Sequence, residues 1–245
     1  MKILAIDTSG QEASAAVFEL RVESCELRVK PVGEIFLNAR TGEKSWTHSE
    51  ILMPAVQQLF HLTRLVPQEI THVAYTCGPG SFTGLRIGAA SALGIARALE
   101  IPAIPVPTLD ALAYNAVGTG ESASIVPMLD ARRGQVYTAV YAHWDGGEIR
   151  QIGAYTASPV AEILEQLSDD RQKIFIGDGV DANIDEIRKK FPYALYPAAN
   201  NSRTRAASAA VWAAEKIFEG VDFPSVPELL YVRQPQAVRT AAQTK

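Results

Sequence analysis

The order of apolar and polar positions divides the first third of the chain into strands and one long helix. Residues 2–7 read KILAID, an apolar run that ends in an acid, and residues 14–20 form a second apolar run after a polar turn. This pair predicts a β-hairpin, and residues 26–38 form a third extended region. Over residues 47–65 the apolar positions recur at spacings of three and four, and the first four residues match a capping box. We therefore expect an amphipathic helix there, which Pro54 either kinks or starts late.

The rest of the chain continues as a mixture of strands and helices. A strand at 71–77 leads through a glycine turn into a helix from Thr83 to about Leu99, and a short extended stretch at 103–106 lies among three prolines. Antiparallel strands followed by a β-α-β crossover predict a mixed sheet with helices on its faces, which is an α/β fold. A similar order of strands and helices follows the prolines. Two such lobes in tandem are typical of the two-lobed actin, sugar-kinase and Hsp70-like architecture. The later predicted elements are a helix at 108–117, strands at 124–129, 134–143 and 148–155, a helix at 159–167, a strand at 173–176, and helices at 181–191 and 204–219.

The proline-rich passage supplies the predicted domain boundary. We assign residues 1–104 to a first lobe and residues 105–203 to a second. The helix near 204–219 is expected to complete the first lobe. Residues 220–245 are punctuated by prolines and predict an irregular C-terminal tail.

Composition narrows the class of protein. The chain has 245 residues, of which 47% are hydrophobic, and its formal net charge is −4. That charge argues against nucleic-acid binding by the chain alone, because RNA and DNA binders normally present a basic face. Cys25 and Cys77 provide neither a disulfide framework nor a metal site. No signal-peptide pattern stands at the start, and no apolar run approaches the roughly 20 residues of a membrane span, so we expect a soluble, cytoplasmic protein.

Residues 78–94, GPGSFTGLRIGAASALG, form the most distinctive block of the sequence. The turn at 78–81 can direct backbone N–H groups at an anion, and Ser81 or Thr83 can cap the helix that follows. The turn lacks both the Walker lysine and the dinucleotide fingerprint, so a purely structural turn is at least as good an interpretation.

The helix after this turn carries small residues along one face. Gly84, Gly88 and Ala92 are spaced four residues apart. Each glycine inside a helix costs about 1 kcal/mol against alanine, so close approach of another backbone should compensate for it. That backbone belongs either to the chain's own sheet or to another subunit, and the pattern leaves both alternatives open. We predict a partner interface formed by Gly84, Leu85, Gly88, Ala92 and Leu93.

Two further turns are candidates for nucleotide binding. Asp7, Thr8 and Ser9 follow the first strand and could hold a phosphate and a hydrated metal ion, although an ordinary Asx turn is the more common use of such residues. Gly177 and Gly179 flank Asp178 after a later strand and could wrap an adenosine, although a simple strand-to-helix connector is more common. The four histidines show no metal-ligand spacing, and no GxSxG motif is present, so we expect no metal site and no catalytic triad.

Four motifs taken together resemble the TsaB family, also called YeaZ. They are IDTS near the start, HSEILMP, GPGSFTGLRIG and the late ELLYVR, and the resemblance covers essentially the whole chain. It implies a two-lobed, actin-like ATPase fold and a role in forming N6-threonylcarbamoyladenosine at position 37 of tRNAs that read codons starting with A. It also implies a non-catalytic partner of TsaD, the subunit that transfers the threonylcarbamoyl group, together with the small ATPase TsaE.

The resemblance also predicts what this chain lacks. TsaD-like chains place an HxxxH metal pair where this chain has Thr108 and Leu112, and an acid where it has Gln11. Leucine cannot bind a metal, so the resemblance implies a pseudo-enzyme and speaks equally against the older idea of an M22 metallopeptidase.

We therefore expect a scaffold subunit that dimerises with TsaD through the first lobe and forms a homodimer when alone. It would have no cofactor by itself, with ATP or ADP at a composite site in the complex, and would meet tRNA only through the complex. The alternative is a stand-alone ATPase or kinase of the actin-like fold.

Overall fold

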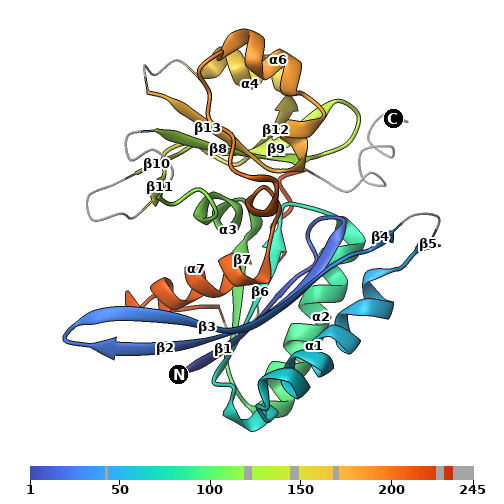
Figure 1. Ribbon diagram of the computed structural model, residues 1–245, viewed down its shortest axis with the longest axis vertical. Helices are drawn as coiled ribbons and strands as arrows, with labels where there is room; N and C mark the ends of the chain where they lie inside the picture. Colours follow the sequence, from blue (N-terminus) through green and yellow to red (C-terminus); the bar gives the residue numbers. More distant parts are fainter. Residues whose placement is uncertain (42–43, 119–122, 144–148, 168–170, 225–228, 234–245) are drawn as a thin grey trace, which may run out of the picture.

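The computed structural model describes residues 1–41, 44–118, 123–143, 149–167, 171–224 and 229–233, and it consists of two lobes stacked along the long axis of the molecule (Figure 1). Each lobe is built around a β-sheet. Among the described residues, no helix has the length and apolar character needed to cross a membrane.

The sheet of the first lobe has the strand order β3-β2-β1-β6-β7. Its antiparallel part is a meander, and its parallel part adds two strands beside β1. The strands are β1 (Lys2–Asp7), β2 (Glu12–Glu23), β3 (Glu26–Asn38), β6 (His72–Gly78) and β7 (Ala103–Pro107), and a small separate ladder joins β4 (Arg40–Thr41) to β5 (Lys44–Ser45).

Helices cover both faces of this sheet (Figure 1). One face packs against α1 (His48–Thr63) and α2 (Phe82–Leu99), and the other against α7 (Ala206–Phe218). Because side chains alternate along a strand, Leu4 and Ile6 lie in the core beneath α1 and α2, whereas Ile3 and Ala5 pack against α7. A helix near the C-terminal end of the chain therefore completes the N-terminal lobe.

Local signals in the sequence set the starts of the two long helices. At α1, the backbone N–H of Thr47 donates to Oε2 of Glu50 at 2.7 Å, as the capping-box prediction requires. The helix begins at His48 and continues through Pro54, so the proline does not delay its start. At α2, Ser81 is the N-cap, and its hydroxyl accepts from the Gly84 N–H at 3.3 Å.

The second lobe repeats the strand arrangement of the first. β9 and β10 pair antiparallel with successive parts of β8, while β13 pairs parallel with β8, as β6 does with β1. β11 and β12 then extend the sheet beyond β10 and β9. The elements are β8 (Ser124–Asp130), β9 (Gln135–Thr138), β10 (Tyr141–His143), β11 (Ile149–Gln151), β12 (Thr156–Pro159) and β13 (Lys173–Ile176), with helices α4 (Val160–Gln166), α5 (Asp178–Asp181) and α6 (Ile184–Lys190).

One predicted strand of the second lobe is divided, and another is shorter than predicted. The strand predicted at 134–143 is divided into β9 and β10, because the ladder breaks at Ala139 and Val140. The strand predicted at 148–155 is observed as β11, which ends at Gln151, and β12 begins only at Thr156. The carbonyl of Val140 accepts from the backbone N–H groups of both Ile152 (2.7 Å) and Gly153 (3.2 Å). Two N–H groups directed at one carbonyl let the chain bend, so that β9 pairs with β12 and β10 pairs with β11.

Two segments cross between the lobes. The first runs from β7 into α3 (Thr108–Tyr114), and the second runs from η3 (Ala199–Asn201) into α7. β7 still pairs with β6 at Pro105 and Pro107, so the first sheet extends beyond the predicted boundary at residue 104. In α3, Ala111 packs in the first lobe, whereas Leu109 and Leu112 pack in the second. This helix therefore contacts both cores and is itself part of the junction. A short helix, η1 (Pro67–Glu69), precedes β6.

Candidate functional site

A cleft of about 370 Å³ lies between the lobes. Four turns line it, and each follows one of the strands β1, β6, β8 and β13. Parallel strands of one sheet end at the same edge, so each lobe directs two turns toward the other. Its lining includes Ser9, Gln11, Phe82, Asp130, Ala131 and Asp178.

The first turn, at residues 7–9, is closed by its own hydrogen bonds. Oδ1 of Asp7 accepts from the Ser9 N–H (3.1 Å), the Ser9 hydroxyl (2.6 Å) and the Thr76 hydroxyl (2.7 Å). Asp7 and Thr8 are fully buried, and the Thr8 hydroxyl donates to the Gly84 carbonyl at 2.8 Å. Of the three predicted residues, Ser9 alone lines the cleft. This geometry is that of an Asx turn whose donors are already used, and it offers a phosphate no free hydroxyl.

The glycine turn before α2 packs against that first turn. The backbone N–H of Ser81 donates to the Ser9 carbonyl at 2.7 Å, so this amide is not free for an anion. A Cβ added to Gly80 would lie closer than 3.0 Å to the same carbonyl. The glycines of this turn thus allow two backbones to meet, which is the structural alternative that the sequence left open.

Of the five residues predicted to form a partner interface on α2, four are buried within the chain itself: Gly84, Leu85, Gly88 and Ala92. A Cβ added to Gly84 or to Gly88 would lie closer than 3.0 Å to Thr8, in the first case to its carbonyl and in the second to its hydroxyl. Leu85 and Ala92 are buried on the same side of the helix. The compensating close approach therefore comes from the chain itself. Helical spacing could not reveal this, because Thr8 lies 76 residues away from Gly84 in the sequence.

The opposite side of α2 is the exposed one. Gly94 lies within the helix, and a Cβ added there would meet nothing within 4 Å. Leu93 beside it is half-buried. Phe82 at the start of α2 is 42% exposed, and Met53 and Leu62 on the neighbouring α1 are 44% and 65% exposed. Nothing within the described chain compensates for the conformational cost of Gly94.

In the second lobe, packing again accounts for the two predicted glycines. Gly177 has φ of 116°, and a Cβ there would lie closer than 3.0 Å to the Met128 carbonyl. A Cβ on Gly179 would lie 2.9 Å from a methyl group of Val136. Neither glycine lines the cleft, but Asp178 between them does, and its Oδ1 accepts from the Asp130 N–H at 3.0 Å. Burial raises the pKa of Asp178 above its ordinary value.

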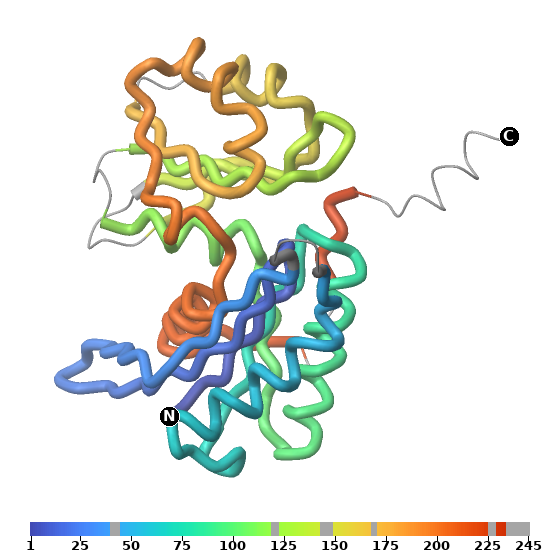
Figure 2. The backbone as a smooth tube through the Cα atoms, turned by 45° about the vertical axis from the view of Figure 1, so that its right-hand side comes forward, coloured from blue at the N-terminus to red at the C-terminus, as the bar shows by residue number. Residues whose placement is uncertain are grey.

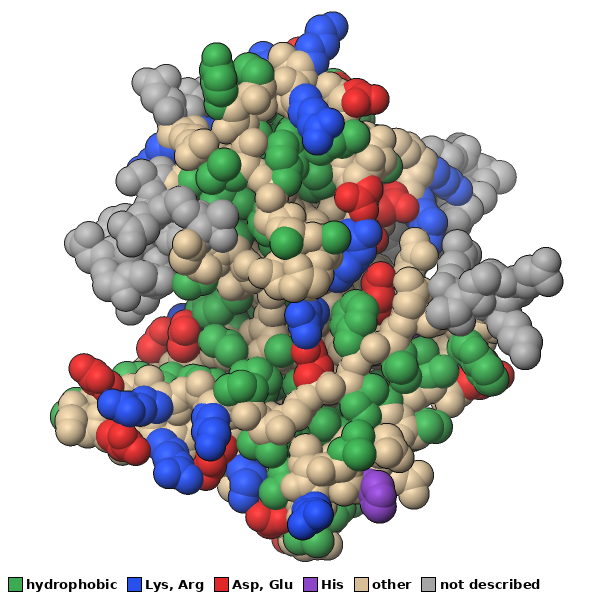
Figure 3. All heavy atoms as spheres, viewed as in Figure 1, with side chains coloured by type: hydrophobic (Ala, Val, Ile, Leu, Met, Phe, Trp, Pro, Cys, Tyr) green, Lys and Arg blue, Asp and Glu red, His purple; other side chains and the backbone are tan. Residues whose placement is uncertain are grey.

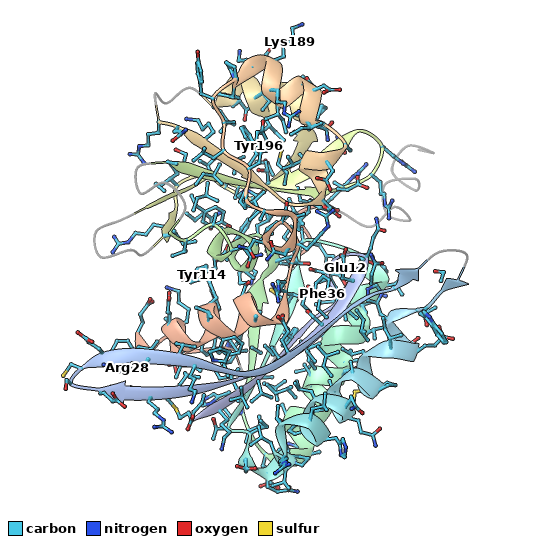
Figure 4. The ribbon with its side chains drawn as sticks, in the orientation of Figure 1. Glu12, Arg28, Phe36, Tyr114, Lys189 and Tyr196 are labelled. Atoms are coloured by element: carbon cyan, nitrogen blue, oxygen red, sulfur yellow. The ribbon has the colours of Figure 1, made fainter. Side chains whose placement is uncertain are left out.

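Charged side chains connect the lobes beside the cleft. Arg203 lies 3.7 Å from Glu12 of the first lobe and 2.6 Å from Asp181 of the second. Glu12, which Figure 4 places at the junction, has a pKa raised by burial, and the Arg203 guanidinium opposes that shift. Figure 3 shows acidic and basic side chains alternating down this face between the lobes. These ion pairs bind the lobes to each other.

The two positions at which TsaD-like chains have their HxxxH metal-binding histidines lie in the core of this chain. Thr108 and Leu112, on α3, are both fully buried. Between them, Oδ1 of Asp110 accepts from the hydroxyls of Tyr141 and Tyr155, each at 2.6 Å. Across the part of the chain that the structure describes, no three His, Cys, Asp or Glu side chains are grouped so that they could hold a metal ion.

Sequence reasoning missed the role of residues 229–233, which it assigned to an irregular tail. The Leu230 N–H donates to the Cys77 carbonyl at 2.7 Å, immediately before the glycine turn. Gly78 has φ of 120°, and a Cβ there would collide with the Leu230 carbonyl. These residues are most of the ELLYVR motif, and that motif was the available signal.

Comparison with known proteins identifies the family. A family model described as "TsaD: tRNA N6-adenosine threonylcarbamoyltransferase" matches residues 43–219. The tRNA threonylcarbamoyladenosine biosynthesis protein TsaB of Bacillus subtilis is 35% identical over 178 residues, which are 72% of this chain and 71% of that protein. The chain belongs to the TsaB family. The predicted resemblance is therefore confirmed, and TsaB membership associates the chain with tRNA threonylcarbamoyladenosine biosynthesis.

Solved structures confirm the TsaB fold. An uncharacterised Pseudomonas aeruginosa protein with similarity to the peptidase YeaZ superposes with a TM-score of 0.72 at 22% identity, covering 95% of this chain and 99% of that one. The activator of 2-hydroxyisocaproyl-CoA dehydratase from Clostridium difficile, solved with bound ADPNP, superposes with a TM-score of 0.50 at 11% identity, covering 92% and 100%. At these identities the likeness concerns the fold alone, and it confirms the predicted two-lobed, actin-like architecture for this TsaB chain.

Proposed function

We propose that the chain is a non-catalytic subunit that pairs with a TsaD-type threonylcarbamoyltransferase. In this proposal the complex, with TsaE as a third component, modifies adenosine 37 of tRNAs that read codons starting with A. One observation carries the proposal: Thr108 and Leu112 stand in the packed core, at the positions where TsaD-like chains have their metal-binding histidines.

Packing around these positions supports a loss of chemistry rather than a rearranged site. Leu112 is fully buried and lies against Gly177, where an added Cβ would come within 2.9 Å of its side chain. A metal site needs ligand atoms that converge on an open space, and a leucine methyl group provides neither. In this proposal the chain therefore has the fold of the family but lacks the side chains that would bind a metal ion.

Nucleotide and tRNA binding then depend on the partner. The donors of Thr8 and Ser9 are used internally, so this chain supplies few groups for a phosphate. We infer that ATP or ADP binds in the complex, at a site that the partner completes, and that tRNA binds through the complex because the net charge of −4 gives this chain little attraction for RNA.

The outer side of α1 and α2 is the surface that we assign to the partner. Gly94 is exposed in mid-helix and is unexplained by the chain's own packing, whereas a second helix backbone could approach closely there. Met53, Leu62 and Phe82 are exposed apolar side chains of the same two helices, and burial of apolar area is what drives association. The same surface would form the homodimer of the isolated chain.

The experiment is a titration of the purified chain with its cognate TsaD, measured by calorimetry. Gly94→Lys should weaken binding at least about tenfold, because a long charged side chain keeps two helices apart. Ala161→Lys, on the exposed side of α4 in the second lobe, is the matched control and should bind normally. Circular dichroism should show both variants folded, since an added side chain at Gly94 meets open space.

A reconstituted tRNA-modification assay tests the role itself. Product should require both this chain and TsaD, and the chain alone should neither transfer the group nor turn over ATP. Unchanged affinity of Gly94→Lys would remove the assigned surface, and ATP turnover or phosphoryl transfer by the isolated chain would favour the alternative of a stand-alone ATPase or kinase.

A further inference from the structure

Residues 229–233 run from the first lobe toward the second, apart from the two crossing segments (Figure 2). Their first half is anchored in the first lobe. Leu229 and Leu230 pack against the apolar core beneath α1 and α2, and the Leu230 N–H binds the Cys77 carbonyl at 2.7 Å. The segment thus continues the hydrogen bonding of the sheet just where β6 ends.

An aromatic cluster orients the middle of the segment. The Tyr231 ring lies 5.6 Å from the Phe82 ring, and its hydroxyl accepts from Nε of Arg86 at 3.3 Å. The Arg86 guanidinium in turn lies 3.8 Å from the centre of the Phe82 ring. Three side chains therefore fix the direction in which the chain leaves the first lobe, and one of them, Phe82, lines the cleft.

The last described residue reaches the second lobe. Nη1 of Arg233 donates to the Ala131 carbonyl at 3.0 Å, in the turn between β8 and β9. Ala131 lines the cleft, and the next three residues of this turn, Arg132, Arg133 and Gly134, all have left-handed backbone conformations, with φ of 64°, 57° and 70°. Arg233 thus binds one of the two turns by which the second lobe closes the cleft.

We propose that residues 229–233 form a C-terminal clamp that fixes the opening of the cleft. Two lobes joined by short crossing segments normally rotate about those segments, and relative motion is the default for a modest interface. Here the crossing segments lie in β7–α3 and at 199–205. A third attachment away from that hinge means that rotation must break the contact between Arg233 and Ala131. The proposal concerns the mobility of this chain alone and does not depend on its partner.

Distances between spin labels on the two lobes test the clamp. The labels are attached at Gln58→Cys on α1 and Glu186→Cys on α6, both exposed, in a Cys25→Ser background. The buried Cys77 thiol stays unlabelled because burial raises its pKa to about 12. Pulsed electron resonance should give one narrow distribution of distances for the parent.

Removing the hydrogen bond from Arg233 to Ala131 should let the two lobes rotate relative to each other. Arg233→Ala should raise the population of other lobe arrangements about tenfold and broaden the distribution, because a hydrogen bond donated by a charged group is lost. Arg97→Ala, which removes an exposed arginine of α2, is the control and should leave the distribution narrow. The proposal is overturned if the parent distribution is already broad, or if Arg233→Ala leaves it unchanged.

Hydrogen exchange gives a second, independent readout. Tyr231→Ala should lower the protection of the Leu230 amide about tenfold or more, because the aromatic cluster holds that segment on β6. Tyr193→Ala, at a tyrosine that is 85% exposed in the second lobe, should not change it. Equal protection in the parent and in Tyr231→Ala would show that the cluster does not hold the segment and would remove the anchored end of the clamp.

Discussion

Replacing Gly88 by alanine should destabilise the fold, although alanine is the better helix former. The added Cβ would lie closer than 3.0 Å to the Thr8 hydroxyl. Thr8 is fully buried, and its hydroxyl donates to the Gly84 carbonyl at 2.8 Å, so it cannot turn away without losing that bond. Overpacking costs about 1–3 kcal/mol, and a broken buried hydrogen bond costs about 1–3 kcal/mol more. Subtracting the helix preference for alanine of about 1 kcal/mol leaves a net loss of about 1–5 kcal/mol.

Gly94→Ala is the matched control on the same helix. Its Cβ would meet open space, so the helix preference alone should act and should stabilise the isolated chain by about 1 kcal/mol. For a chain of this size, 1 kcal/mol corresponds to a shift of about 2–4 °C in Tm. Thermal unfolding followed by circular dichroism should therefore move in opposite directions for the two variants.

A double variant separates the contact from other effects. Thr8→Ala removes the hydroxyl that the new Cβ would strike, so Gly88→Ala should cost less in that background than in the parent. If Gly88→Ala alone is as stable as Gly94→Ala, the close contact between Gly88 and Thr8 is refuted, and the face formed by Gly84, Gly88 and Ala92 must be open to solvent.

Two further predictions concern buried ionisable groups. Cys25 is exposed, whereas burial raises the pKa of Cys77 to about 12, so a thiol reagent near pH 8 should label one cysteine in the native protein and two in denaturant. Burial also raises the pKa of Asp110, so the native state binds more protons than the unfolded state between the ordinary carboxyl pKa and the raised one, and stability should fall as pH rises through that window. Urea midpoints measured from pH 4 to 7 should fall less with rising pH in Asp110→Asn than in the parent. Glu12 and Asp178, whose pKa values burial raises in the same direction, contribute to the slope in both proteins, so an identical slope in the variant would exclude a contribution from Asp110.

Features fixed by neighbours in the sequence could be predicted. The hairpin of β1 and β2 follows from alternating side chains, and the capping box of α1 involves Thr47 and Glu50, three residues apart. The C-cap of α2 at Glu100 agrees equally well with the predicted helix end. In each case the interacting groups lie within one turn or one hairpin, which is the range that a sequence pattern records.

Features fixed by distant contacts could not be predicted in the same way. The spacing of Gly84 and Gly88 correctly indicated that a backbone comes close, but it could not say whose backbone, because Thr8 belongs to another strand. Likewise, Asp7 and Thr8 have the composition of a phosphate turn, and only their hydrogen bonds to Thr76 and Gly84 show that they are used internally. The contacts of residues 229–233 bridge separations of more than 100 residues, beyond any local pattern.

The position of α7 has a consequence for synthesis on the ribosome. The first sheet is made early, but one of its faces is covered by a helix that ends at Phe218. While translation continues, Ile3, Ala5 and Phe18 have no helix to cover them, whereas the elements of the second lobe are contiguous and can assemble as they emerge. The N-terminal half of this protein is therefore expected to reach its native state last, and chains that stop before residue 206 would expose an apolar sheet face to chaperones and proteases.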